Sequence, residues 1–297
     1  MQVPAQFDYE VAGSVDEAIS LLQQHGPESR LLAGGHSLIP MMKLRLAFPE
    51  VLIDIHELDG ELRYVREEGG ALRVGALARH RDLLESPVVQ GRYTLLADAE
   101  KFIADPLVRN MGTVGGSFAQ ADPSEDLPAA FIALGADVVI RGPQGERTVA
   151  VEDLYVGPFE TVMEPDEILL ETRVPRAPDG SAYIKVERRA GDYASAAVGV
   201  AVWMSGEEIE EARIGMCGVG PTTLEAREAG EVLNGQRPHA ELYRRAGEAA
   251  SQECDPSDDA RGTPEYKRDL VRVLVGRAME RAVGRARDTG SPSAAGR

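Results

Sequence analysis

Two short glycine-rich segments constrain the fold of this 297-residue chain more than any other feature. One covers residues 33–37 (AGGHS) after a predicted strand, and the other covers residues 113–117 (TVGGS) between regular elements. Consecutive glycines let the backbone approach a ligand closely and turn N–H groups toward an anion, and flanking hydroxyls add donors. A single Gly-Gly pair is typical of an ordinary turn, but two such loops together indicate a diphosphate site.

Neither loop carries a lysine or an arginine, so backbone dipoles would balance the charge of a bound phosphate. This arrangement fits a permanently bound dinucleotide better than a nucleotide consumed by hydrolysis. The sequence lacks the GxGxxG, GxxxxGKS/T, HExxH and GxSxG signatures. Residues 80–83 (HRDL) mimic a kinase catalytic loop, but Pro87 stands where the metal-binding Asn is required, which excludes a kinase.

The first 177 residues predict an α+β unit in two parts. Ser14 and Glu17 form a capping box before apolar residues at helical spacing, and the helix is expected to end at residues 26–27. The rest of the first part, about 1–57, is expected to be strand 30–33, the glycine loop, helix 39–46 and strand 51–55. The second part, about 58–177, is expected to hold strands 62–65, 72–74 and 168–174, helices 79–84, 93–103 and 126–134, and a hairpin of 138–141 with 147–151.

A break near residue 177, rich in proline and glycine, predicts a domain boundary. Beyond it, β-rich runs at 182–188, 194–204 and 209–218 predict a three-stranded antiparallel sheet. Helices at about 224–233, 240–253 and 264–285 complete a C-terminal domain expected over 178–285. The small and polar residues 286–297 predict a disordered tail.

Composition excludes several classes of function. The 49 acidic residues exceed the 32 Lys and Arg, and the net charge of −17 repels nucleic acids and anionic lipid. Two cysteines, Cys217 and Cys254, are too few for a disulfide framework or an iron–sulfur cluster. The start of the sequence lacks a signal-peptide pattern, and the apolar-rich stretch 129–140 is too short to span a bilayer. We therefore expect a cytoplasmic protein with no nucleic-acid partner and no transmembrane segment.

The segments around both loops resemble a known family. Residues 30–55 (RLLAGGHSLIPMMKLRLAFPEVLIDI) and 103–129 (IADPLVRNMGTVGGSFAQADPSEDLPA) are similar to the FAD-binding subunits of the molybdenum hydroxylases, above all to the medium subunits of aerobic carbon monoxide dehydrogenases. The similarity includes residues 185–198 and 263–279, so it extends from about Phe7 to the last helix. It implies an FAD-binding domain of the vanillyl-alcohol-oxidase (PCMH) type with two subdomains, and then a C-terminal domain with a three-stranded antiparallel sheet and helices.

The resemblance also implies roles for individual residues. The two loops would hold the FAD pyrophosphate, Asp126 would accept a hydrogen bond from a sugar or ribityl hydroxyl, and Lys185 would lie near the pyrimidine end of the isoalloxazine ring. Tyr193, beside Asp192, would pack against that ring and control access to it. The implied cofactor-binding residues, with no catalytic residue and no metal ligand among them, are Ala33, Gly34, Gly35, His36, Ser37, Leu38, Ile103, Thr113, Val114, Gly115, Gly116, Ser117, Asp126, Leu169, Lys185, Asp192 and Tyr193.

Without the resemblance, the same residues favour plainer roles. Asp126 would be a helix N-cap, Lys185 a solvated strand residue and Tyr193 a core aromatic. In related flavin oxidases a Gly-Gly-His histidine binds FAD covalently, whereas His36 is interpreted here mainly as a backbone and packing contributor. Asp122 and Glu125 are expected to form a solvated acidic loop.

The implied function is that of an FAD-containing electron-transfer subunit. A large subunit would carry the molybdenum cofactor and a small subunit two 2Fe–2S clusters, as a dimer of heterotrimers, and FAD would pass electrons to a quinone or another acceptor. Contact with the inner face of the membrane would arise only through that acceptor. Three alternatives remain: the FAD subunit of a xanthine, aldehyde or N-heterocycle dehydrogenase, a stand-alone flavin oxidase or reductase, and a scaffold that has lost its flavin.

Overall fold

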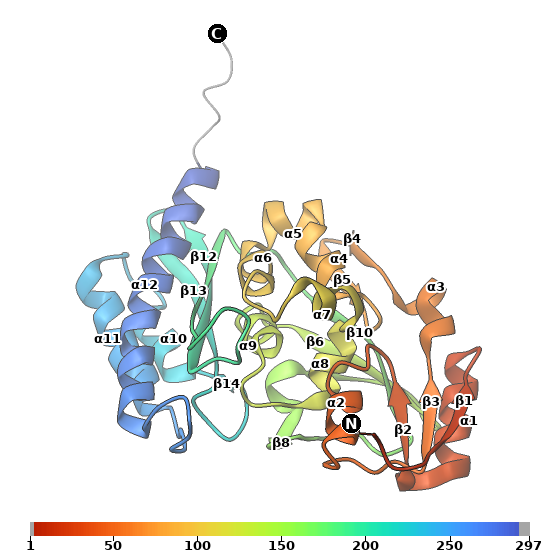
Figure 1. Cartoon of the computed structure of the whole chain (residues 1–297). Coiled ribbons are helices and arrows are strands. Elements are labelled where there is room, and N and C mark those ends of the chain that lie inside the picture. Colours follow the sequence, from red (N-terminus) through yellow and green to blue (C-terminus); the bar gives the residue numbers. More distant parts are fainter. Residues whose placement is uncertain (1–2, 291–297) are drawn as a thin grey trace.

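The computed structural model describes residues 3–290 and begins with a small parallel β-sheet (Figure 1). Its strand order is β1-β3-β2, and both outer strands pair in parallel with β3. Parallel neighbours need crossover connections, and α1 and α2 supply them. Ser14 caps α1 by accepting a hydrogen bond from the Glu17 N–H, as the capping box predicts. The elements are β1 (Asp8–Val11), α1 (Val15–His25), η1 (Gly26–Glu28), β2 (Ser29–Leu32), α2 (Leu38–Lys43) and β3 (Val51–Asp54).

A five-stranded antiparallel sheet of order β4-β5-β10-β6-β7 forms the second unit. The predicted strand 168–174 is confirmed as β10, at the centre of this sheet, and the predicted hairpin is β6 with β7. The elements up to the helices are η2 (His56–Leu58), α3 (Asp59–Leu62), β4 (Val65–Glu68) and β5 (Ala71–Gly75). Those after the helices are β6 (Asp137–Gly142), β7 (Gly145–Ala150), η3 (Val151–Asp153), β8 (Tyr155–Gly157), β9 (Glu160–Thr161) and β10 (Ile168–Val174).

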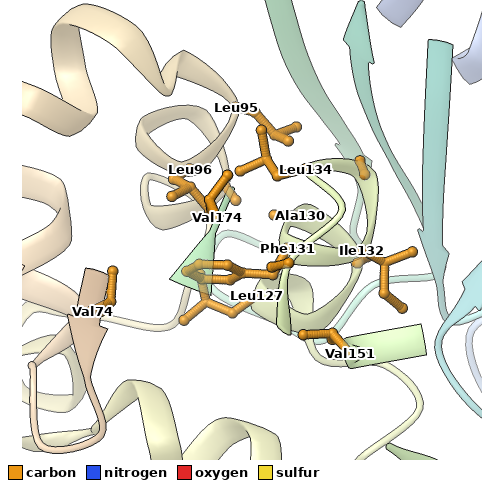
Figure 2. Packing of buried hydrophobic residues seen from close by; sticks show 14 of the residues in the cluster. Val74, Leu95, Leu96, Leu127, Ala130, Phe131, Ile132, Leu134, Val151 and Val174 are labelled. Atoms are coloured by element: carbon orange, nitrogen blue, oxygen red, sulfur yellow. The ribbon is translucent and has the colours of Figure 1, made fainter. Parts of the chain in front are cut away.

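Helix α9 is the centre of the hydrophobic core (Figure 2). Every residue of this helix is buried, and Leu127, Phe131 and Leu134 pack among side chains of β5, β10 and α6. A helix that is apolar on all sides is stable only when other elements surround it, which fixes α9 between the five-stranded sheet and the C-terminal sheet. The helices of this unit are α4 (His80–Glu85), α5 (Pro87–Arg92), α6 (Thr94–Glu100), α7 (Pro106–Met111), α8 (Val114–Gln120) and α9 (Asp126–Ala133).

The C-terminal sheet has four strands in the order β11-β12-β13-β14, one more than the three strands that the sequence predicted. The fourth strand has two residues, Leu224–Glu225, in a segment that helical spacing predicts as the start of a helix. Backbone pairing with β13 overrides that local preference. The elements are β11 (Gly180–Val186), β12 (Ala196–Ser205), β13 (Glu208–Cys217), β14 (Leu224–Glu225), α10 (Arg227–Leu233), α11 (Ala240–Gln252) and α12 (Pro264–Gly290).

Both faces of this sheet are covered. Ala197 and Ala201 of β12 join the core around α9, whereas Val198 and Val200 pack against the C-terminal helices. Gly215 of β13 allows close approach, because a Cβ atom there would lie 2.0 Å from the carbonyl oxygen of Ala129 in α9. One core therefore contains residues of both halves of the chain, and a second core lies between the C-terminal sheet and its helices.

The remaining differences from prediction concern two helices, a hairpin, one expected strand and the C-terminal end of the chain. Helices α5 and α7 and the β8–β9 hairpin occupy segments for which the sequence predicted no element. Residues 62–65 are not a strand, because only Val65 belongs to β4 and Leu62 ends α3. Helix α12 extends to Gly290, so residues 286–290 are not part of a tail, and residues 291–297 lie outside the described residues. Within residues 3–290, no helix combines the length and apolar character needed to cross a membrane.

Candidate functional site: a cavity between two glycine loops

A cavity of about 1180 Å³ lies where the N-terminal sheet, the helices of the second unit and a loop of the C-terminal sheet meet. This volume exceeds the roughly 300–1,000 Å³ of ordinary small-molecule pockets. Its walls include the β2–α2 loop, the first turns of α8 and α9, and the β11–β12 loop. All the expected cofactor-binding residues line this cavity except Val114 and Lys185.

The first glycine loop joins β2 to α2 and is fixed by its own hydrogen bond. His36 Nδ1 lies 2.7 Å from the Gly34 carbonyl oxygen and donates to it, which ties the side chain to the loop backbone. Gly35 has a φ of +70°, a left-handed conformation that favours glycine. Ser37 precedes α2 and its side chain makes no capping hydrogen bond. Its hydroxyl is therefore available to a ligand in the cavity.

The second glycine segment differs from its prediction as a turn, because Gly115 and Gly116 form the first turn of α8. Thr113 caps this helix, and its hydroxyl accepts a hydrogen bond of 3.1 Å from the Gly116 N–H. A Cβ atom on Gly115 would lie 2.7 Å from Cβ of Ala76. The glycine is therefore required for packing of α8 against the segment after β5.

The two glycine loops touch each other. A Cβ atom on Gly34 would lie 2.5 Å from the Met111 carbonyl oxygen, just before the second loop, and 3.0 Å from the backbone nitrogen of Thr113, its first residue. Glycine at position 34 thus lets two backbones approach, and both loops face the same cavity. Together they form a cradle of backbone and hydroxyl groups that suits a diphosphate.

Asp126 is buried and already holds two partners. Its Oδ2 accepts a hydrogen bond of 2.8 Å from Lys185 Nζ, and its Oδ1 accepts one of 2.7 Å from the Tyr183 hydroxyl. Burial raises the pKa of Asp126, and the Lys185 ammonium opposes that shift. Lys185 does not line the cavity, and the exposed fraction of its side chain is 1%. Lys185 therefore lies behind Asp126 and does not form part of the cavity wall.

Tyr193 lies at the rim of the cavity, and 42% of its surface is exposed. The Arg261 guanidinium carbon lies 5.6 Å from the centre of its ring, within range of a cation–π contact. Asp192 Oδ1 accepts a hydrogen bond of 2.9 Å from the Tyr193 N–H, which orients the loop. The aromatic ring is thus supported on one side and open toward solvent on another.

Several lining residues escaped the sequence analysis. Glu125 contributes to the wall, and its Oε2 is buried, so the expected solvated loop is wrong for this residue. His80 lines the cavity with its Nδ1 3.2 Å from the Glu100 carboxylate and its Nε2 3.4 Å from the Ser117 hydroxyl. The available sequence signal was misleading: residues 80–83 resembled a kinase motif, and Glu125 stood in a polar, acidic stretch.

Comparison with protein families shows to which family this chain belongs. The family described as the FAD binding domain in molybdopterin dehydrogenase matches residues 5–177, and the CO dehydrogenase flavoprotein C-terminal domain matches residues 181–282. The chain belongs to the molybdopterin dehydrogenase FAD-binding family. The cavity therefore lies mainly in the FAD-binding domain of this family and receives residues 191–193 from the C-terminal domain.

Relatives of known name support the same membership. The chain is 43% identical over 285 residues to the carbon monoxide dehydrogenase medium chain of Hydrogenophaga pseudoflava, covering 95% of this chain and 99% of that one. It is 41% identical over 288 residues to the corresponding chain of Afipia carboxidovorans, covering 96% and 100%. The crystal structure of the Cu,Mo-CO dehydrogenase in its cyanide-inactivated form contains a chain that matches with a TM-score of 0.92 and 41% identity, covering 95% of this chain and 99% of that one.

Proposed function

We propose that this chain is the FAD-carrying medium subunit of a carbon monoxide dehydrogenase of the molybdenum type. The observation that carries the proposal is the joint formation of one dinucleotide-sized cavity by both glycine loops in a chain 43% identical to such a subunit. The residues present fit FAD: hydroxyls and backbone groups face the cavity where a diphosphate would lie, and an aromatic ring stands at its rim. Bound FAD would supply two-electron redox chemistry.

Each part of the cavity then has a task. The cradle of the two loops binds the diphosphate without a lysine or an arginine of its own. Asp126, fixed by Lys185 and Tyr183, orients a hydroxyl of the sugar or ribityl chain. Tyr193 covers part of the ring and limits access of water and oxygen to it. Ile103 and Leu169 provide apolar surface.

The oxidation of carbon monoxide is assigned to partner subunits. The only cysteines, Cys217 and Cys254, are both buried and free and are too few to hold two 2Fe–2S clusters, so the clusters are assigned to a small subunit. The molybdenum cofactor is assigned to a large subunit, as the resemblance implies. In this proposal the complex is a cytoplasmic dimer of heterotrimers, and a quinone or a similar carrier is the final acceptor. The FAD subunit receives electrons from the clusters.

A second candidate has support from other relatives. The chain is 37% identical over 279 residues to the glyceraldehyde dehydrogenase medium chain of Sulfolobus acidocaldarius, which has the same subunit type. Because the substrate would be bound by another subunit, this chain can serve an aldehyde or N-heterocycle dehydrogenase with the same cavity. Carbon monoxide is preferred because the chains with the higher identities, 43% and 41%, are of that type.

Flavin content tests the proposal. The purified chain should contain about one FAD per molecule, and acid precipitation should release it, whereas flavin in the pellet would indicate covalent attachment to His36. Ser37→Asp places a negative charge in the cradle while keeping a residue suited to the start of a helix, so FAD content should fall strongly. Ser14→Asp makes the same change at the cap of α1, outside the cavity, and should leave FAD content unchanged. Full FAD content in Ser37→Asp would contradict the cradle.

A further inference from the structure

The histidine of segment 80–83 has no role in the function proposed above. His80 is the first residue of α4, and it is buried, with 5% of its surface exposed. It nevertheless lines the cavity, together with Ser117 of the second glycine loop. The hydrogen bonds of its two ring nitrogens fix the orientation of a buried histidine, so the partners of these nitrogens indicate what the side chain does.

Both ring nitrogens of His80 have a partner. Nδ1 lies 3.2 Å from Oε1 of Glu100, the last residue of α6, and Nε2 lies 3.4 Å from Ser117 Oγ. Glu100 is completely buried, and its Oε2 has no hydrogen-bond partner within the described part of the chain. The three side chains therefore form a hydrogen-bonded row, Glu100–His80–Ser117, that runs from the core to the cradle.

The backbone holds His80 against the second glycine loop. The His80 N–H donates a hydrogen bond of 3.2 Å to the Gly112 carbonyl oxygen, and Arg79 forms an antiparallel bridge with Thr113. A Cβ atom at position 112 would lie 2.9 Å from Cδ2 of His80, so the glycine there leaves room for the imidazole ring. The position of the ring is thus set from two sides, by Glu100 in the core and by the backbone next to the cradle.

The direction of these hydrogen bonds follows from the chemistry of a diphosphate. A serine hydroxyl has one proton, and the oxygen atoms of a diphosphate only accept. For Ser117 to donate to them, its oxygen accepts from His80, so Nε2 carries a proton. A second proton lies between Nδ1 and Glu100, and the pair as a whole is neutral. Without His80, the Ser117 hydroxyl can rotate and donate to the Thr113 carbonyl one turn earlier, as serines in helices do.

We propose that His80, held by Glu100, orients the Ser117 hydroxyl so that it donates a hydrogen bond to the diphosphate of bound FAD. The inference rests on the proposed function, because FAD is the ligand concerned. His80 is a positioning residue: it acts through Ser117 and takes no part in electron transfer. A cradle without lysine or arginine thereby gains a donor whose direction is fixed from the core.

The test is the dissociation constant of FAD, measured by flavin fluorescence on the full chain freed of its cofactor. Two substitutions divide the functions of the ring nitrogens. The amide of His80→Asn reaches the position of Nδ1 and keeps a partner for the buried Glu100, whereas the amide of His80→Gln reaches the position of Nε2 and keeps a donor for Ser117. We expect His80→Asn to weaken FAD binding by about tenfold, the lower end for a hydrogen bond to a charged group, and His80→Gln to restore most of the affinity.

A second substitution shows whether His80 acts through Ser117. Ser117→Ala alone should weaken binding by about tenfold, and His80→Asn should cause no further loss in that background, because the hydroxyl that His80 orients is gone. Ser37→Ala removes a hydroxyl from the first glycine loop and is the matched control. In the Ser37→Ala background, His80→Asn should weaken binding by the same factor as in the wild type. Far-ultraviolet circular dichroism checks that each variant folds.

The outcomes separate the inference from the function. An equal loss from His80→Asn in the wild type and in Ser117→Ala would show that His80 does not act through Ser117, and the inference would be wrong while the proposed function stands. Wild-type affinity in Ser117→Ala, a variant that leaves the buried Glu100–His80 pair intact, would overturn the inference in the same way. Failure of the folded wild type to bind FAD would instead refute the proposed function.

Discussion

Gly34 and Gly60 show how differently single glycines contribute to this protein. A Cβ atom on Gly34 would overlap the backbone of the second loop, whereas one on Gly60 in α3 would meet nothing within 4 Å. We expect Gly34→Ala to lower the free energy of unfolding by roughly 1–3 kcal/mol through overpacking and to reduce FAD content as the loops separate. Gly60→Ala should leave FAD content unchanged and stabilise the helix slightly, by about 0.5–1 kcal/mol. Thermal unfolding and flavin absorbance would measure both, and equal stability of the two variants would contradict the loop contact.

A variant of Tyr193 can test access to the flavin ring separately from the binding of FAD. Tyr193→Ala removes an aromatic contact worth about 0.5–1.5 kcal/mol and leaves the cradle and Asp126 in place, so FAD should be retained. The uncovered ring should react faster with oxygen and deliver fewer electrons to its acceptor. Stopped-flow spectroscopy of the assembled complex would follow both reactions, with cluster reduction by substrate as the internal control. Unchanged flavin reoxidation in a fully flavinated variant would reduce Tyr193 to a packing role.

At the scale of elements, a pair of carboxyl groups joins η3 to β14. Glu225 lies near Glu152, and Arg213 contacts both, 2.8 Å from Glu152 and 2.9 Å from Glu225. Burial and the hydrogen bond with Glu152 raise the pKa of Glu225 to about 7. The folded protein therefore binds this proton more tightly than the unfolded chain does. The resulting stability is fully present below pH 4.5 and is lost as the pH rises through about 7.

Glu225→Gln should remove this part of the pH dependence. Between pH 5 and 8 we expect the free energy of unfolding of the wild type to fall by about 1 kcal/mol more than that of the variant, after allowance for screening by solvent. Denaturant titrations at several pH values would measure the difference. Glu231→Gln, an exposed carboxylate in α10, serves as the control and should keep the wild-type slope. If the free energy of unfolding depended on pH equally in the wild type and in Glu225→Gln, the raised pKa of Glu225 would be contradicted.

Elements were predictable where local pattern and tertiary packing agree. The apolar run of β10 and the glycine-closed hairpin of β6 and β7 have one stable arrangement, so their predicted positions hold. Helix α8 was missed because its first turn contains Gly115 and Gly116, which disfavour a helix locally. The cap from Thr113 and the burial of Phe118 compensate for them. Strand β14 was missed because it has only two residues, Leu224–Glu225, which pair with Met216 and Gly215 of the preceding strand, and two residues are too few to show a strand pattern.

For the whole molecule, we expect the separately expressed chain to bind FAD but not to oxidise carbon monoxide. Activity with an artificial electron acceptor should appear only after reconstitution with the molybdenum and iron–sulfur subunits, because two buried cysteines cannot hold the 2Fe–2S clusters that would carry electrons to the flavin. Direct reduction of the flavin with dithionite would confirm that the isolated chain is redox-competent. Carbon monoxide oxidation by the isolated chain would disprove the proposed division of labour.

The candidate site was predictable as a set of loops but not as a set of contacts. Family resemblance identified residues that the fold brings to one cavity from distant positions. It could not indicate that Lys185 would lie behind Asp126, nor that Glu125 would be enclosed, since both depend on the side-chain packing of α9 against β11 and α8. Burial of a charged residue is a property of the assembled tertiary structure, and a polar stretch of sequence gives no indication of it.

The cavity wall is built from residues far apart in the chain, and this limits how early during synthesis the cavity can form. Its lining begins with residues of α1 and ends at Tyr193, in a loop held between β11 and β12. Those strands are covered by α12, near the end of the chain. Long-range contacts of this kind form late, after the ribosome has released nearly the whole polypeptide. We therefore expect the cavity to be complete only once α12 packs on these strands, so that a chain truncated before α12 should not retain FAD.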